Sequence, residues 1–147
     1  MFLTSTRIRE AIRAGDLDAA GQMLGRAYSL AARVVKGDQL GTKLGFPTAN
    51  LDVSGLVLPP NGVYAAHALV RGKAHHAVLN IGHRPTVQNP TPTIHVEVHI
   101  LDFTAEIYGE EMEITFATRL RDEQKFASLD ELKIQITRDI AEARKKF

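Results

Sequence analysis

The alternating segment 93–103, TIHVEVHILDF, constrains the fold more than any other part of the chain. Branched apolar residues occupy the even positions from 94 to 100, and His95, Glu97 and His99 occupy the odd positions between them. Successive side chains of a β-strand point to opposite faces, so this segment predicts a strand with one apolar and one polar face. The four branched residues are expected to share one face.

Several other short runs of β-forming residues are separated by Gly, Pro and Asn. They span residues 32–37, 62–72, 74–82 and 112–120. Gly72 separates the second and third runs closely enough to predict a hairpin. Five or six short strands of this kind favour an antiparallel barrel or sandwich, because parallel strands need longer crossover connections.

Helical patterns occupy the two ends of the sequence. Residues 5–25 predict two short helices, with Gly15 ending the first, Asp16 capping the second and Gly25 ending it. Ser128 and Glu131 form a capping box at the start of a C-terminal helix, in which each side chain can bond to the other's backbone N–H. The apolar stripe of that helix, which we expect to lie on the barrel, is Leu129, Leu132, Ile136, Ile140 and Ala143.

Composition limits the range of functions. The 147 residues suit one domain, and 18 basic against 17 acidic residues leave a net charge of +1, which argues against nucleic acid as the main partner. There is no cysteine, so disulfides and thiolate metal sites are excluded. No apolar run approaches the roughly 18 residues of a membrane span, and the first residues do not resemble a secretory peptide. We therefore expect a cytoplasmic protein without a membrane partner.

The segment 36–50, KGDQLGTKLGFPTAN, is rich in glycine. Gly37, Gly41 and Gly45 recur every four residues, and such glycines can let backbone N–H groups approach phosphate oxygens. The segment is not a Walker A loop, because only three residues separate the first two glycines and Leu44 follows Lys43. The alternative interpretation is a hairpin connection, and the spacing alone does not decide between the two.

Three further residues are candidates for chemistry. Thr48 and Asn50 lie two apart on an extended segment, so both side chains point the same way and offer the neutral oxygens that Mg²⁺ accepts beside substrate phosphates. The alternative is that they only hydrogen-bond a local turn. Glu97 could accept a proton from a substrate hydroxyl within hydrogen-bond reach, or could simply be a solvated strand residue.

Taken together, several stretches resemble one family. LGFPTANL, LPPNGVYA, NIGHRPT, VEVHILDF, IYGEEMEITF and LRDEQKFASLDELKIQI stand in the order found in riboflavin kinases. The similarity runs from about Gly25 to the C-terminus. It implies a mainly β fold, a six-stranded antiparallel Greek-key β-barrel with a C-terminal helix packed on it. It also implies transfer of the ATP γ-phosphate to the ribityl 5′-hydroxyl of riboflavin, giving FMN.

The resemblance also assigns roles to residues. Thr48 and Asn50 occupy the metal-contacting positions of the PTAN motif, which implies Mg²⁺, and Glu97 occupies the position of the catalytic base. The glycine-rich segment resembles the flap over the nucleotide phosphates, and the loop around Arg121 resembles the part that closes over the flavin. The residues expected to bind ATP or flavin are thus Gly37, Gly41, Lys43, Gly45, Pro47, Thr48, Asn50 and Arg121. The expected partners are riboflavin or FMN and ATP or ADP.

Two positions depart from the family pattern. Thr42 stands where Arg or Lys is frequent, so that Lys43 is expected to supply the charge, and Ala32 stands where Gly is common, just before the first expected strand. Either change could weaken nucleotide binding or shift the flap.

A rival function, a non-catalytic barrel that binds flavin or nucleic acid, explains the fold but not the combination of PTAN with the Glu97 strand.

Residues 1–25 resemble the junction of bacterial bifunctional FAD synthetases, in which an adenylyltransferase domain precedes the kinase. We therefore interpret residues 1–25 as a helical linker remnant and residues 26–147 as the kinase domain, and a fused adenylyltransferase domain in a full-length protein is consistent with this. The chain has no His-x-Gly-His signature, so we expect it not to adenylylate FMN.

Overall fold

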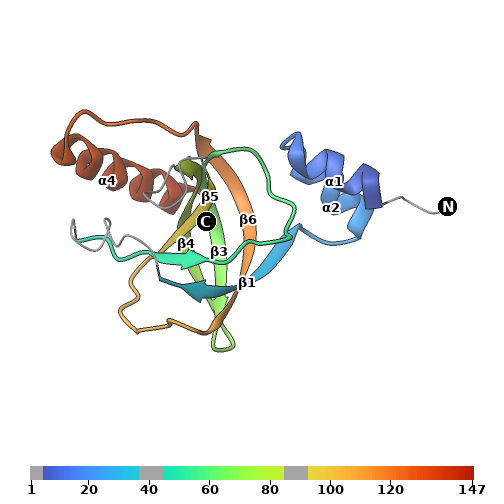
Figure 1. Cartoon of the computed structure of the whole chain (residues 1–147), viewed down its shortest axis with the longest axis horizontal. Coiled ribbons are helices and arrows are strands. Elements are labelled where there is room, and N and C mark those ends of the chain that lie inside the picture. Colours follow the sequence, from blue (N-terminus) through green and yellow to red (C-terminus); the bar gives the residue numbers. More distant parts are fainter. Residues whose placement is uncertain (1–4, 37–44, 85–92) are drawn as a thin grey trace.

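The computed structural model describes residues 5–36, 45–84 and 93–147. Figure 1 shows a β-barrel with α4 on one side and the paired helices α1 and α2 on the other. In chain order the elements are α1 (Ser5–Arg13), α2 (Leu17–Leu24), β1 (Ser29–Val35), β2 (Ala49–Leu51), β3 (Gly62–Val70), β4 (Lys73–Arg84), β5 (Thr93–Ile100), β6 (Glu111–Arg121) and α4 (Leu129–Lys146).

The six strands form a closed antiparallel barrel in the order β1-β2-β5-β4-β3-β6. The predicted hairpin is confirmed, because β3 and β4 pair from Gly62–Ile81 to Val70–Lys73 around a turn at Arg71 and Gly72. Strand β2 pairs with β5, and β1 pairs with β6 and so closes the circle. The barrel confirms the fold implied by the family resemblance and excludes the sandwich.

Alternate residues of the strands fill the barrel interior. Leu79, Ile81, Met112 and Ile114 are fully buried there, and Val96, Val98 and Ile100 of β5 join the same core. Ile94 belongs to the same alternating set but is 36% exposed. Strand β2 pairs only with residues 96–98 of β5, so it does not extend over the start of that strand.

The helix ends largely follow the predicted signals. The Asp16 side chain accepts a hydrogen bond from the N–H of Ala19 at 3.0 Å, and Gly25 ends α2 in the left-handed conformation. At α4, the Ser128 hydroxyl accepts from the Glu131 N–H at 3.1 Å, as predicted. The Glu131 carboxylate, however, accepts from the Ala127 N–H rather than from that of Ser128.

The C-terminal helix lies on the outer face of the barrel, against β3, β4 and β6. Leu132, Ile136 and Ile140 are partly buried there and Ala143 fully, but Leu129 is 56% exposed, so the packed stripe begins one turn later than predicted. Among the described residues, no helix is long and apolar enough to cross a bilayer.

Strand β1 begins earlier than the sequence pattern indicated. Ala32 therefore lies within the strand rather than before it, and its side chain is buried in the barrel core. This departure from the family pattern thus affects interior packing. The other departure, Thr42, lies outside the described residues.

Candidate active site

A row of three polar side chains crosses adjacent strands on the outer face of the barrel. Asn50 of β2 lies directly opposite Glu97 of β5, and Glu97 lies directly opposite Asn80 of β4. Directly opposed residues of antiparallel strands share one face, with Cβ atoms about 4.5–5.5 Å apart. The register therefore brings Asn50 and Glu97 together, although 46 residues separate them in the sequence, and adds Asn80, which the sequence analysis did not identify.

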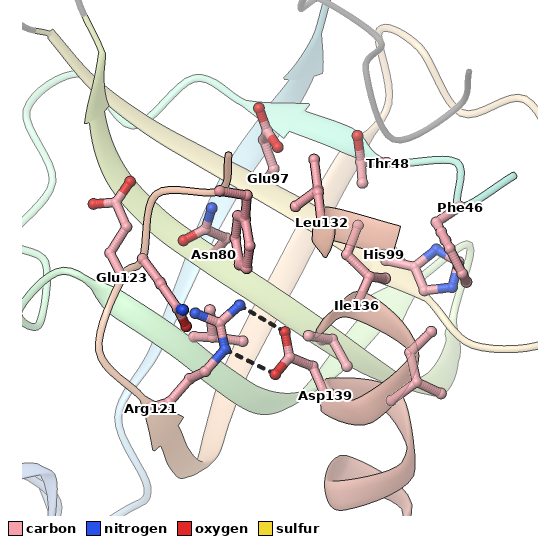
Figure 2. Close-up of a pocket in the computed structure, with 15 residues that line it drawn as sticks. Phe46, Thr48, Asn80, Glu97, His99, Arg121, Glu123, Leu132, Ile136 and Asp139 are labelled. Carbon is pink, nitrogen blue, oxygen red and sulfur yellow. Dashed lines mark hydrogen bonds and ion pairs between the residues drawn. The ribbon is translucent and has the colours of Figure 1, made fainter. Parts of the chain in front are cut away.

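A pocket, which we call the helix-side pocket, lies between this barrel face and α4 (Figure 2). Its apolar lining comes from the barrel, the preceding loops and α4, namely Phe46, Val63, Val78, Phe126, Leu132, Ile136 and Ile140. Its polar lining consists of Thr48, Asn80, Glu97, His99, Arg121, Glu123, Gln124 and Asp139. Figure 2 shows Glu97 and Thr48 at one end of the pocket and the Arg121–Asp139 pair at the other. The pocket is thus a mainly apolar slot with an acidic group at one end.

A second pocket, the loop-side pocket, adjoins the first. It is formed by the end of β1, the segment from Pro47 to Asn50, two residues of β5 and the loop 103–108. Thr48 lines both pockets, whereas Asn50 lines only the loop-side pocket and Glu97 only the helix-side pocket. Two ligands bound in the two pockets would therefore meet beside Thr48, between the amide of Asn50 and the carboxylate of Glu97.

The bend that carries Thr48 is attached to β5 by His99. Its ring Nδ1 lies 2.7 Å from the carbonyl oxygen of Pro47, and because a carbonyl only accepts, His99 donates this hydrogen bond. The ring of Phe46 packs edge-on against the same imidazole, with centroids 5.9 Å apart. Gly45 begins the bend with a φ of 88°, a conformation that favours glycine. These contacts hold Thr48 at the junction of the two pockets.

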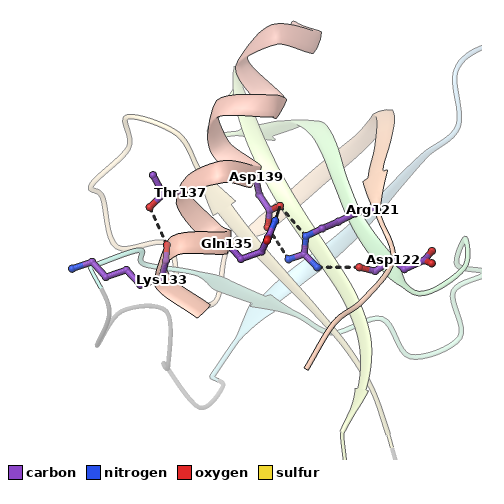
Figure 3. A network of polar contacts seen from close by, with 6 residues as sticks. All are labelled: Arg121, Asp122, Lys133, Gln135, Thr137 and Asp139. Carbon is purple, nitrogen blue, oxygen red and sulfur yellow. Dashed lines mark hydrogen bonds and ion pairs between the residues drawn. The ribbon is translucent and has the colours of Figure 1, made fainter. Parts of the chain in front are cut away.

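Arg121 lines the helix-side pocket but is occupied by an ion pair (Figure 3). Its Nε and Nη2 atoms donate to the two carboxylate oxygens of Asp139, both at 2.8 Å, and Nη1 donates to the carbonyl of Asp122. Gln135 donates a further hydrogen bond to Asp139 at 3.0 Å. The Arg121–Asp139 pair therefore joins the end of β6 to α4 and forms one end wall of the pocket.

Glu123 crosses the outer face of β4 next to the polar row. A Cβ added to Gly82 would lie 2.2 Å from Oε1 of Glu123, so only glycine leaves room for the carboxylate in this position. Gly82 lies two residues after Asn80 and hence on the same face of the strand. The segment that follows β6 therefore reaches the floor of the helix-side pocket.

Thr48 and Asn50 are the residues at the junction of the two pockets that could hold a metal ion. Thr48 and Asn50 supply neutral hard oxygens, and Asn50 is only 8% exposed. Within residues 5–36, 45–84 and 93–147, no group of three or more His, Asp or Glu side chains forms a metal-binding cluster. A donor set of this kind suits a cation whose remaining ligands are phosphate oxygens and water.

The predicted site residues are distributed over these features as follows. Glu97 and Arg121 line the helix-side pocket, Pro47 and Asn50 the loop-side pocket, and Thr48 both. Gly45 lines neither pocket. Gly37, Gly41 and Lys43 lie outside the described residues.

Two site residues could have been found from sequence patterns. Asn80 alternates with the buried Leu79 and Ile81, so the strand pattern places it on the outer face. Asp139 interrupts the apolar stripe of α4 between Ile136 and Ile140, where a charged residue needs a partner. The segment 123–126, in contrast, has no local pattern that indicates a pocket wall.

The chain is similar to known proteins over nearly its whole length. The family model described as "Flavokinase: Riboflavin kinase" matches residues 24–147. The bifunctional riboflavin kinase/FMN adenylyltransferase of Pseudomonas fluorescens is 42% identical over 142 residues, which cover 97% of this chain and 45% of that protein.

Two solved structures are also similar. One, described as a macrolide-efflux protein from Streptococcus pneumoniae, superposes with a TM-score of 0.84 at 34% identity, over 96% of this chain and 46% of that one. The riboflavin kinase of Trypanosoma brucei superposes with a TM-score of 0.56 at 26% identity, over 80% of this chain and 77% of that one.

The chain spans about half the length of the curated relatives it matches, at 45% of the Pseudomonas fluorescens protein and 46% of that of Escherichia coli. The family model nevertheless matches all six strands and α4. These matches and the barrel architecture show that the chain belongs to the flavokinase (riboflavin kinase) family.

Proposed function

We propose that this chain is an ATP-dependent riboflavin kinase, which transfers the γ-phosphate of ATP to the ribityl 5′-hydroxyl of riboflavin and produces FMN. The observation that carries this proposal is the junction of two pockets at Thr48, with Glu97 facing one pocket and Asn50 the other. A phosphotransferase needs such an arrangement, because its catalysis consists mainly of holding two substrates in line.

Riboflavin suits the helix-side pocket. Its planar ring system can pack between Val63 and Val78 of the barrel and Ile136 and Ile140 of α4, where the lining is apolar. Its ribityl chain would then extend toward the polar end formed by Thr48 and Glu97. The apolar and polar parts of this pocket thus match the two parts of the substrate.

ATP suits the loop-side pocket. Lys36, which immediately precedes the segment 37–44 in the sequence, and Pro47, three residues after it, both line this pocket. Binding there directs the phosphates toward Thr48 and Asn50, the residues that would hold Mg²⁺. A bound Mg²⁺ would neutralise charge on the phosphate oxygens during transfer. The role of Gly37, Gly41 and Lys43 over the phosphates stays a prediction.

Glu97 is the proposed catalytic base. Its carboxylate accepts the proton of the 5′-hydroxyl as that oxygen forms a new bond to the γ-phosphorus. The bond from the γ-phosphorus to the β–γ bridging oxygen breaks at the same time, and ADP leaves with that oxygen. The family resemblance and the position of Glu97 opposite Asn50 support this role.

A direct test is incubation of the chain with riboflavin, ATP and Mg²⁺, followed by chromatographic separation of FMN. We expect FMN to form with ATP and Mg²⁺ present and not without either. A flavin-binding barrel without activity would retain riboflavin unchanged, and a nucleic-acid-binding barrel would not bind it. Either result would contradict the proposal.

The cytoplasmic location remains a prediction.

A further inference from the structure

Asn80 lines the helix-side pocket, and its amide oxygen is an unsatisfied hydrogen-bond acceptor. This Oδ1 atom is shielded from solvent and has no hydrogen-bond partner among the described residues. A polar atom buried without a partner costs free energy, so native structures nearly always satisfy such atoms with protein, water or ligand. Among the described residues, Asn80 Oδ1 is the only buried side-chain nitrogen or oxygen atom in this condition.

The position of Asn80 indicates which ligand group would satisfy this atom. Asn80 lies directly opposite Glu97 across β4 and β5, which places the two side chains about 5 Å apart on one face. Val78 lies two residues before Asn80 on the same face of β4 and belongs to the apolar lining of the pocket. Asn80 therefore lies where the apolar slot meets the acidic end of the pocket (Figure 2).

We propose that Asn80 is a substrate-binding residue, whose amide oxygen accepts a hydrogen bond from a ribityl hydroxyl of riboflavin. This inference rests on the proposed kinase function. A chain of hydroxyl-bearing carbons that ends at Glu97 passes Asn80 within a few bonds, because one cross-strand spacing separates the two residues. The flavin ring lies farther along the slot, among Val78, Ile136 and Ile140.

The unsatisfied oxygen has a consequence for stability that a purely structural asparagine would not have. Asn80→Leu has nearly the same shape and removes a buried acceptor that has no partner in the unliganded protein. An apolar side chain of this shape has no buried acceptor to desolvate, and the replacement loses no hydrogen bond made by the amide oxygen. We therefore expect the thermal midpoint of the unliganded Asn80→Leu variant to be unchanged or raised.

The test compares two flavins that differ only in the side chain on the ring. Riboflavin carries the ribityl chain, whereas lumiflavin carries a methyl group in its place. For Asn80→Leu we expect the Kd of riboflavin to rise about tenfold, equivalent to about 1.4 kcal/mol, and the Kd of lumiflavin to stay within about twofold. Asn80→Ala, which cannot overfill the pocket, should show the same discrimination between the two flavins.

Val78→Ala is the matched control, because Val78 lies on the same strand, on the same face and in the same pocket. This substitution shortens an apolar side chain of the pocket and removes no hydrogen-bond acceptor. It should therefore raise the Kd of riboflavin and the Kd of lumiflavin by the same factor. This control shows whether the assay detects a loss of ring contact.

Three results would overturn the role of Asn80. They are an unchanged riboflavin Kd in both Asn80 variants, an equal loss for both flavins, or a thermal midpoint of Asn80→Leu below that of the wild type. If the wild type still forms FMN, such a result contradicts only this inference. Failure of the wild type to form FMN would instead contradict the proposed function, and this inference with it.

Discussion

At the scale of single residues, strand register explains how the candidate site is assembled. Asn50, Glu97 and Asn80 come from three different strands, and each strand contributes one outward side chain at the same level. Because hydrogen bonding between strands determines this alignment, a shift of one residue in β5 would turn Glu97 toward the interior. The geometry of the site thus depends directly on the barrel's hydrogen-bond register.

The first prediction concerns the carboxylate of Glu97. Glu97→Gln keeps the shape of the side chain but removes its ability to accept a proton, so we expect turnover to fall about 10²- to 10⁴-fold. Steady-state rates of FMN formation at saturating riboflavin and ATP would measure this. A turnover within threefold of the wild type would exclude Glu97 as the catalytic base.

At the scale of secondary-structure elements, a buried ion pair adds to the apolar packing that holds α4 on the barrel. The Arg121–Asp139 contact joins the helix to the end of β6, and the Asp139 side chain is 6% exposed while that of Arg121 is 21% exposed (Figure 3). Breaking a buried pair by removing one partner is strongly destabilising, because the remaining charge has no compensation. The helix in turn forms one wall of the helix-side pocket.

We expect Asp139→Asn to lower the free energy of unfolding by about 3 kcal/mol, at the lower end for buried pairs because Arg121 is partly exposed. In a chain of this length, that corresponds to a fall in the thermal midpoint of about 6–12 °C. The riboflavin KM should also rise, because α4 is less firmly held.

Glu142→Gln on the same helix is the control, since the exposed Glu142–Lys145 pair should contribute less than about 1 kcal/mol. Equal effects of the two changes would contradict this view of α4.

A second connection between elements should give stability a dependence on pH. Arg71, at the β3–β4 turn, donates to both carboxylate oxygens of Glu110, at 2.8 and 2.6 Å. The hydrogen bond and charge of Arg71 lower the pKa of Glu110 below its ordinary value. A lowered folded-state pKa stabilises the fold above the unfolded value of about 4.3, and this contribution is lost as the pH falls through the folded value.

Glu110→Gln should therefore unfold at a lower temperature than the wild type at pH 6–7. The difference between the two proteins should shrink as the pH falls below about 4.3 and disappear in more acidic solution. Thermal unfolding followed by circular dichroism between pH 2.5 and 7 would measure it. A difference that stays constant across this range would show that the ion pair does not contribute through Glu110 ionisation.

At the scale of the whole molecule, the flavokinase family model matches most of the chain, from residue 24 to residue 147. The chain itself spans about half the length of its bifunctional relatives. The match to the family model begins at residue 24, within α2, so the division into residues 1–25 and 26–147 stays a prediction. Leu17 of α2 packs against the barrel core, so α2 is in contact with the barrel.

The 147-residue chain, tested alone, should convert riboflavin and ATP to FMN without forming FAD. Under the proposed function the two pockets serve one phosphoryl transfer, and the sequence lacks the His-x-Gly-His signature that the adenylyltransferase resemblance would require. Incubation of the chain with FMN, ATP and Mg²⁺, followed by chromatography, would test this. Detection of FAD would contradict it.

Local patterns predicted the elements better than their arrangement. Alternation in β5 and the short connection at Gly72 are local signals, and the structure confirms the strand and the hairpin. Closure of the barrel between β1 and β6 is a pairing of distant segments, which no local pattern specifies; only the resemblance implied it. The interruption of the apolar stripe at Asp139 could have signalled a partnered charge, but the identity of the partner could not be predicted, because Arg121 belongs to another element.

The opposite orientation of neighbouring residues along β4 has a practical consequence. Leu79 and Ile81 point into the core and line none of the pockets described above, whereas Val78 and Asn80 line the helix-side pocket. If the helix-side pocket binds the flavin as proposed, the residues that set thermostability and those that set substrate preference alternate along the same strand. An engineer could redesign the inward set for heat tolerance and the outward set for new flavin analogues as two largely independent libraries.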